Sequence, residues 1–178
     1  DTARLYGPVA LSTAAIVAFF VAVAVNSRIG VFAEPLGKLF IGPDSWTRAY
    51  RALELRFEGG WFSDTLQRVG LDGISQHWSR PVDALNIAMA ELFGLITGGF
   101  RSGLEAWATW SGPLQILPLV AILAWAVHPL VTRRPRMAFA LAVLLPLQLY
   151  LWGYFFPGRI DWHPQNFMAT AGALGLLV

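Results

Sequence analysis

The chain has 178 residues, of which 56% are hydrophobic and 13% are charged, and its mean hydropathy is +0.53. A soluble globular domain carries about twice that share of charge, so the composition favours a membrane protein. The net charge of +2 is too small and too dispersed for a nucleic-acid partner. The absence of cysteine excludes disulfides, zinc–thiolate sites and thiol chemistry.

Residues 1–30 are expected to form the first membrane-spanning helix. Residues 8–25 carry no charge, and Arg4 and Arg28 flank them. With the residues just before, this run reaches the ~20 residues that cross the ~30 Å hydrocarbon core. Ala22-Val23-Ala24 resembles a signal-peptide cleavage site, but a positive region of a single arginine favours a retained span.

Residues 31–112 mix charged residues with glycine and proline and contain no run long enough to span. They are expected to form an outer, periplasmic layer of amphipathic helices. The first helix is predicted from Pro43, with Asp44 or Ser45 as cap, to Gly59-Gly60. Its apolar stripe is expected to lie on the membrane surface or on the transmembrane hairpin of residues 113–157, and its charged residues lie on the other sides of the helix. The stripe consists of Trp46, Tyr50, Leu53 and Phe57.

Further short helices are expected in the same outer segment. One covers residues 62–69 and is broken at Gly70 and Gly73. Another begins at Pro81, and Glu91 places it at the interface rather than across the bilayer. The apolar face of this helix consists of Leu85, Met89, Leu92 and Ile96. A last short amphipathic helix begins with Phe100, Leu104 and Trp107 and ends at Gly112-Pro113.

Residues 113–157 are expected to form a transmembrane hairpin. Residues 114–131 and 137–156 carry no Asp, Glu, Lys or Arg and are each long enough to span. The short loop between them holds Arg133, Arg134 and Arg136, which indicates the cytoplasmic side. Residues 31–112 and the loop of residues 158–165 then lie outside, and residues 158–178 comprise this outer loop and the start of a further apolar segment. This arrangement predicts a multi-pass protein of the bacterial inner membrane. Pro118 and Pro146 predict kinks, or a hinge that faces a ligand.

The expected fold is therefore an all-α integral membrane protein. It has three transmembrane helices, outer interfacial helices and a partial fourth span within residues 167–178. Because the chain starts at Asp1 rather than Met and stops inside an apolar run, we expect it to be a fragment.

His128 is the only ionisable side chain inside a predicted span. It could ligate a metal-bearing pigment, since Ala124 four residues earlier leaves room for a flat ring, or it could join a proton path. The simpler interpretation is that it reaches the lipid headgroups, one turn from the arginines. No other cofactor is predicted.

Catalytic chemistry is not expected. Asp161 and His163 lie two residues apart, but an acid–base pair needs a third group and a pocket. One histidine and one aspartate are too few ligands for zinc. For the same reasons, His77 is not expected to form a catalytic or metal site. The sequence contains no phosphate-binding loop, hydrolase nucleophile elbow or metalloprotease motif.

Eight tryptophans suit a chain with much interfacial surface. We expect them to contact lipid headgroups and neighbouring subunits, and the residues concerned are Trp46, Trp78, Trp107, Trp110, Trp125, Trp152 and Trp162. The alternative is a cage for a quaternary ammonium, built from Trp46, Trp61, Trp78, Trp107 and Trp110, but their spacing does not set them around one point.

Residues 78–152 resemble the front part of permease subunits of glycine betaine/proline-type ABC importers. The shared features are Pro81-Val82-Asp83-Ala84, Glu91-Leu92-Phe93, Leu104-Glu105-Ala106, Pro113 before a span with Ile122-Leu123-Ala124-Trp125, and Leu151-Trp152. The resemblance covers less than half of the chain. The Glu-Ala-Ala loop that meets the ATPase in that family is absent from these residues, so no functional residue is transferred.

The resemblance implies a non-catalytic transmembrane scaffold of an importer for compatible solutes. The alternative is an accessory subunit of a photosynthetic or respiratory membrane complex, which packs against neighbouring subunits and lipid. A fainter likeness of residues 152–167 to the loops of reaction-centre core subunits lacks the pigment-ligating histidines.

Overall fold

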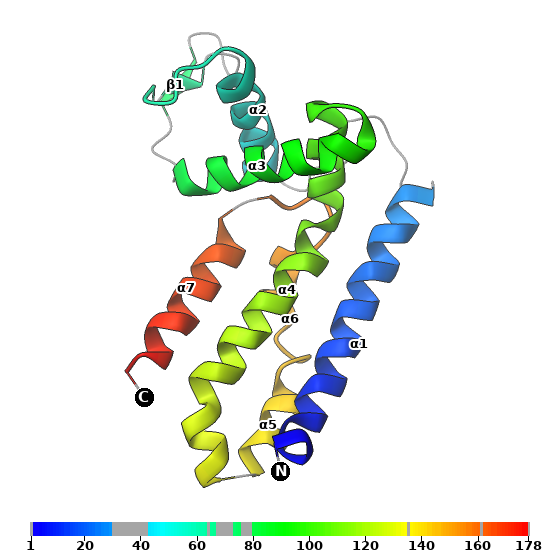
Figure 1. Ribbon diagram of the computed structural model, residues 1–178, viewed down its shortest axis with the longest axis vertical. Helices are drawn as coiled ribbons and strands as arrows, with labels where there is room; N and C mark the ends of the chain where they lie inside the picture. The colour runs from blue at the N-terminus through cyan, green and yellow to red at the C-terminus, as the bar shows by residue number, and fades with distance from the viewer. Residues whose placement is uncertain are drawn as a thin grey trace. The chain divides into compact units, whose positions relative to one another are not determined.

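The computed structural model describes residues 2–29, 43–63, 65–66, 73–75, 80–134, 136–160 and 162–177. This part of the chain is mostly helical (Figure 1). Its elements, in order, are α1 (Thr2–Ile29), α2 (Pro43–Phe57), β1 (Thr65–Leu66), β2 (Ile74–Ser75), α3 (Arg80–Thr97), α4 (Phe100–Arg133), α5 (Arg136–Leu144), α6 (Leu149–Trp152), the 3-10 helix η2 (Gly153–Phe155) and α7 (His163–Gly175).

The chain divides into two compact units, which we describe separately. Unit 1 comprises Asp1–Phe32, Gly112–Phe156 and His163–Val178. Unit 2 comprises Ala33–Ser111 and Pro157–Trp162. Helix α4 therefore contributes its first turns to unit 2 and the rest to unit 1.

Among the described residues, two helices are long and apolar enough to cross a membrane: α1, over Tyr6–Asn26, and α4, over Phe100–Arg133. The third expected span is not a single helix, because α5 ends at Leu144 and a turn separates it from α6. Pro146 lies in that turn, where it has no N–H to continue the helix. It ends the helix instead of kinking it, and the Trp152 indole donates to the Leu145 carbonyl at 2.8 Å.

The predicted helix end at Gly112-Pro113 is wrong. Helix α4 continues through Pro113, Pro118 and Pro129 to Arg133. Gly112 has a packing role instead, since a Cβ there would overlap the carbonyl oxygen of Phe155. A proline costs one backbone hydrogen bond, and packing on both sides of it can hold a long helix together.

In unit 1, α1 runs antiparallel to the later part of α4, while α7 runs alongside α4 in the same direction (Figure 1). The core between α1, α4, α6 and η2 consists of Ile16, Phe20, Ile116, Leu119, Val120, Trp152 and Phe155. Helix α7 is fixed by a 2.7 Å bond from Gln165 Nε2 to Gln115 Oε1. Near its other end, Gly175 lies so close to Ala126 that a Cβ would stand 2.8 Å from the alanine Cβ.

Unit 2 contains α2, α3, the first turns of α4 and a two-stranded antiparallel pair, with Thr65 opposite Ser75 and Leu66 opposite Ile74. The helix predicted over residues 62–69 is wrong where the structure describes it. The Arg51 guanidinium binds the carbonyls of Ser63 and Thr65, the latter at 3.0 Å. These carbonyls are then engaged by a side chain rather than by a helical backbone.

Helices α3 and α4 cross at backbone contact in unit 2. The turn between them uses Gly98 (φ +89°), and the amides of Gly98 and Gly99 donate to the Gly94 carbonyl. A Cβ on Gly103 would overlap the carbonyl oxygen of Ala90. Small residues thus set the distance between the two helices.

Inside unit 2, α2 and α3 bury faces other than their apolar stripes, and the expected contact of those stripes with a membrane surface stays a prediction. On α2 the stripe is partly exposed, with Tyr50 at 42% and Phe57 at 64%. The buried residues of α2 are Ser45, Arg48, Ala49, Arg51, Ala52, Glu54 and Leu55. On α3, Leu92 and Ile96 are exposed, and the buried residues are Val82, Asp83, Asn86 and Ala90.

Candidate functional sites

A buried ion-pair network joins α2 to α3 at the centre of unit 2. Arg48 Nη1 lies 2.6 Å from Asp83 Oδ1, and the two side chains are 1% and 0% exposed. Arg80 Nη1 lies 3.2 Å from the other oxygen of Asp83. A buried carboxylate is tolerated only when its oxygens are compensated, and here an arginine faces each oxygen.

Arg51 forms a second polar contact of α2. Besides the Ser63 and Thr65 carbonyls, it lies 3.7 Å from Glu54 Oε2. Arg51 and Glu54 line a polar hollow of about 200 Å³ with Glu58, Gly59, Gly60, Ser63 and Thr65. Because positive and negative groups share its wall, we interpret this hollow as part of the polar contact by which Arg51 binds β1 to α2.

A third group of polar contacts fixes Arg159 and Ile160 to the helices of unit 2. Asn86 Nδ2 donates to the Ile160 carbonyl at 3.1 Å, and the Ile160 amide donates to Ser45 Oγ at 3.4 Å. Ser111 Oγ donates to the Arg159 carbonyl at 3.0 Å. Serines and an asparagine from three helices thus bind the backbone of Arg159 and Ile160.

The expected interface tryptophans divide into core and surface residues. Trp107 is 3% exposed and donates its indole N–H to Asn86 Oδ1 at 2.9 Å, and Trp152 is 5% exposed. Both were expected at a lipid interface but are buried, because their indole N–H groups find acceptors inside the protein. Trp46 and Trp110 are half-buried, Trp61, Trp125 and Trp162 are exposed, and Trp78 lies outside the described residues.

His128 is exposed and pairs with Tyr6 across α1 and α4. The Tyr6 hydroxyl lies 2.6 Å from Nδ1, and the two rings stack 5.8 Å apart at 19°. The other ring nitrogen, Nε2, is a donor or an acceptor according to which group carries the shared proton. Tyr6 was missed from the sequence, although it is the only tyrosine of the first span and the antiparallel alignment brings it to His128.

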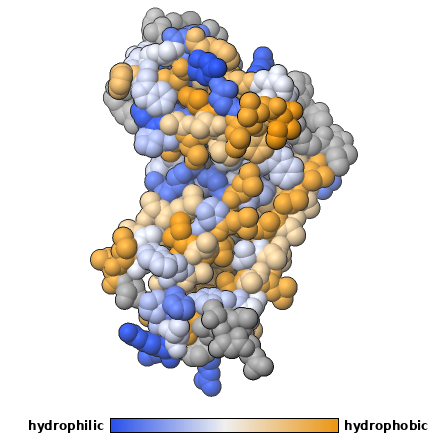
Figure 2. All heavy atoms as spheres, in the orientation of Figure 1, coloured by the Kyte–Doolittle hydropathy of each residue, from blue (hydrophilic) through white to orange (hydrophobic). Residues whose placement is uncertain are grey.

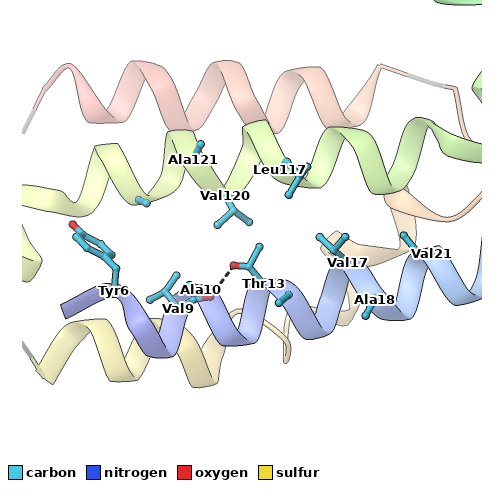
Figure 3. A pocket seen from close by; sticks show the side chains of 12 residues that line it. Tyr6, Val9, Ala10, Thr13, Val17, Ala18, Val21, Leu117, Val120 and Ala121 are labelled. Carbon is cyan, nitrogen blue, oxygen red and sulfur yellow. Dashed lines mark hydrogen bonds between the residues drawn. The ribbon is translucent and has the colours of Figure 1, made fainter. Parts of the chain in front are cut away.

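An apolar groove of about 640 Å³ lies between α1 and α4 in unit 1. Figure 3 shows Val9, Thr13 and Val17 of α1 on one side and Leu117 and Val120 of α4 on the other. The Thr13 hydroxyl donates to the Val9 carbonyl at 2.8 Å, so its hydrogen-bonding capacity is used within α1. Tyr6 and Ala124 belong to the same lining.

The break at Pro146 has an apolar hollow beside it, also in unit 1. Its volume is about 510 Å³, and Phe19, Phe20 and Trp152 are among the residues that line it. The hinge or ligand-facing break predicted at Pro146 thus has a space next to it. The lining offers hydrocarbon and one serine hydroxyl, Ser12, which suits apolar contact rather than chemistry.

Arg133, Arg134 and Arg136 are exposed at the junction of α4 and α5. Figure 2 shows hydrophilic residues gathered at this end of unit 1. The prediction that they lie on the cytoplasmic side depends on a membrane and stays a prediction.

The remaining predicted candidates do not come together as a site. His163 begins α7 and stacks on Tyr154 at 4.1 Å, while Asp161 and His77 lie outside the described residues. Among the residues that the structure describes, no three histidine, aspartate or glutamate side chains could share a metal ion.

An exposed apolar surface remains on unit 2. Leu92, Leu95 and Ile96 lie on one face of the last turns of α3, and they are 55%, 83% and 87% exposed. At the end of α2, Phe57 packs edge-on against Phe100, and Arg56 pairs with Glu91 of α3. Together these side chains form an exposed apolar patch on α3.

Comparison of the chain with protein-family models, with curated proteins and with solved structures finds no match.

Proposed function

We propose that the chain is a non-catalytic transmembrane scaffold of an ABC importer for compatible solutes, in the bacterial inner membrane. The observation that carries this is the resemblance of residues 78–152, which falls on residues that build the fold. Asp83 is the centre of the buried ion-pair network, and Leu104 and Trp152 are 2% and 5% exposed. A likeness of core residues supports a shared scaffold and transfers no transport chemistry.

The apolar helices support the membrane part of this proposal. The hydropathy of the spanning windows of α1 and α4 is 2.4 and 2.0, and 22% of each window is buried. Most of their apolar surface is therefore available to lipid or to other subunits. By the positive-inside rule, Arg133, Arg134 and Arg136 lie in the cytoplasm and the charged helices of unit 2 lie outside.

Co-isolation tests the importer assignment. The intact gene product, tagged and solubilised from its native membranes in mild detergent, should bring down an ATPase subunit with a phosphate-binding loop. Deletion of the gene should abolish uptake of labelled glycine betaine, and the plasmid-borne gene should restore it. Co-isolation with a pigmented or haem-containing complex instead, with uptake unchanged, would overturn the assignment.

Because the chain has no cysteine, single cysteines report its orientation cleanly. Thr132→Cys lies in the last turn of α4, and Arg101→Cys lies in its first turn, and both positions are exposed. In intact spheroplasts a membrane-impermeant maleimide should label Arg101→Cys and leave Thr132→Cys unlabelled until the cells are lysed. The reverse pattern would contradict the proposed topology.

The exposed face of Leu92, Leu95 and Ile96 favours the alternative, an accessory subunit of a photosynthetic or respiratory complex. Such a face suits a neighbouring subunit, whereas under the importer assignment it would lie on the membrane surface, as the sequence predicts. The co-isolation above distinguishes the two assignments.

A further inference from the structure

We propose that the groove between α1 and α4 binds an acyl chain of an anionic phospholipid, with the lipid phosphate at the end marked by Tyr6, His128 and the arginines of the α4–α5 junction. This site rests on the membrane location proposed above. To that location it adds the class of the bound lipid and the end of the groove at which the lipid phosphate lies.

Small side chains make up much of the lining of the groove. Ala10, Ala14 and Ala18 recur at four-residue intervals on α1, and Ala121 and Ala124 of α4 belong to the same lining. The volume of about 640 Å³ lies within the ~300–1,000 Å³ of ligand pockets. From Tyr6 to Val21 the lining extends roughly 22 Å at 1.5 Å per residue, which suits an extended hydrocarbon chain.

The lining offers a ligand almost nothing but hydrocarbon along this length. Of the residues that form it, only Tyr6 and Thr13 carry polar side-chain atoms. The Thr13 hydroxyl is bound to the Val9 carbonyl, and Tyr6 lies at the end of the groove. A polar ligand would lose its hydration there without replacement, whereas an acyl chain loses nothing.

The end of the groove at Tyr6 is polar and positively charged. His128 lies one turn beyond Ala124 on α4, and its ring stacks on Tyr6. Exposed Arg133, Arg134 and Arg136 follow within the next turns. Guanidinium groups at the end of transmembrane helices bind phosphate headgroups through charge-assisted hydrogen bonds.

The charge of unit 1 commits the site to an anionic lipid. Its sequence contains Arg4, Arg28, Arg133, Arg134 and Arg136, but Asp1 is its only acidic residue. A transmembrane helix of a partner could use the same small residues, but it would not account for this excess of positive charge. A neutral lipid would not account for it either.

Native mass spectrometry of the full-length protein tests the proposal. The protein is reconstituted in nanodiscs with equal amounts of phosphatidylglycerol and phosphatidylcholine that carry identical acyl chains. Phosphatidylglycerol should be retained about tenfold over phosphatidylcholine. Replacing Arg133, Arg134 and Arg136 together by glutamine should bring that ratio near one, while Arg101→Gln, on unit 2, should leave it unchanged.

Filling the groove tests the acyl-chain part. Ala14→Trp should lower the number of retained lipids of both kinds, and Ala14→Leu should do so to a smaller extent. Ala22→Trp is the matched control, since Ala22 is exposed on the same helix and does not line the groove. Circular-dichroism melting of each variant checks that α1 still forms.

Three results would overturn the proposal. They are equal retention of the two lipids by the unaltered protein, retention unchanged in a folded Ala14→Trp variant, and loss of a second copy or a co-isolated chain from that variant in place of lipid. A protein that alkaline carbonate releases from membranes would contradict the membrane location itself. Failure of lipid retention alone, in a protein that still brings down an ATPase, leaves the proposed function standing.

Discussion

Helices α2 and α3 of unit 2 meet through a buried ion pair beside an apolar cluster, whereas α1 and α4 of unit 1 meet mainly through apolar side chains. In unit 2, Arg48 and Asp83 are almost completely buried while Leu95 and Ile96 are exposed. In unit 1, Ile16, Phe20 and Ile116 form the core, and the exposed surface is apolar as well. Unit 2 therefore buries charged side chains beside its apolar core, while unit 1 is apolar both in its core and on much of its surface.

The difference shows what decides which face of a helix is buried. Hydrophobicity alone would bury the stripe that contains Tyr50 and Phe57. The structure buries the opposite face because Arg48 meets a carboxylate on the neighbouring helix and because Ala49 and Ala52 allow a close approach. A charge with a buried partner can therefore displace an apolar side chain from the interior.

Removing Asp83 should give the largest effect. Asp83→Ala leaves Arg48 buried without its carboxylate, and the free energy of unfolding should fall by about 3–5 kcal/mol. The measurement is denaturant unfolding in detergent micelles, followed by tryptophan fluorescence.

The Arg56–Glu91 pair is the matched control for this prediction. It joins the same two helices at the same sequence separation, but its side chains are 46% and 47% exposed. A double-mutant cycle on Arg56 and Glu91 should give a coupling energy of only about 0–1 kcal/mol. Equal coupling energies for the two pairs would show that the burial of Arg48 and Asp83 is not what matters.

Close packing in unit 1 predicts the next effect. Gly112→Ala places a methyl group against the Phe155 carbonyl, and the overpacking should cost about 1–3 kcal/mol. Gly7→Ala is the control, because nothing lies within 4 Å of a Cβ there and alanine favours the helix. Thermal melting of the two variants should move in opposite directions. A stable Gly112→Ala variant would mean that α4 and η2 are further apart than described.

The sequence predicted helix positions better than helix partners. Pro43 and Gly59-Gly60 mark the ends of α2 correctly, since chain-breaking is local. The predicted caps, Asp44 and Ser45, lie inside the helix, and Ser45 Oγ accepts from the Ile160 amide instead. The burial of Asp83 and of Trp107 could not be predicted, since their partners Arg48 and Asn86 lie 35 and 21 residues away. At Pro146 the sequence predicts a kink, whereas in the structure the helix ends. There the Trp152 indole donates to the Leu145 carbonyl, a contact that the sequence does not predict.

Asn86 should give an intermediate effect on unit 2. Asn86→Ala removes its bonds to the Ile160 carbonyl and to the Trp107 indole, and about 1–3 kcal/mol should be lost. Hydrogen exchange should become faster at the Ile160 amide, which donates to Ser45 Oγ, and at the neighbouring Gly158 amide, which donates to the Ala108 carbonyl. Exchange that stays as slow as in the unaltered protein would show that Asn86 does not fix this segment.

The exposed face of α3 should give the smallest effect on stability and the clearest one on association. Replacing Leu95 and Ile96 together by serine removes side chains that are 83% and 87% exposed, so stability should change by less than about 0.5 kcal/mol. If this face binds a neighbouring subunit, the double variant should lose that subunit in co-isolation while its melting temperature stays constant.

The control for a general loss of apolar surface is Leu11→Ser on α1, where the side chain is 74% exposed in unit 1. Unchanged co-isolation of the α3 variant would mean that unit 2 exposes this face for another reason, and the contrast between the units would then lie only in their interiors.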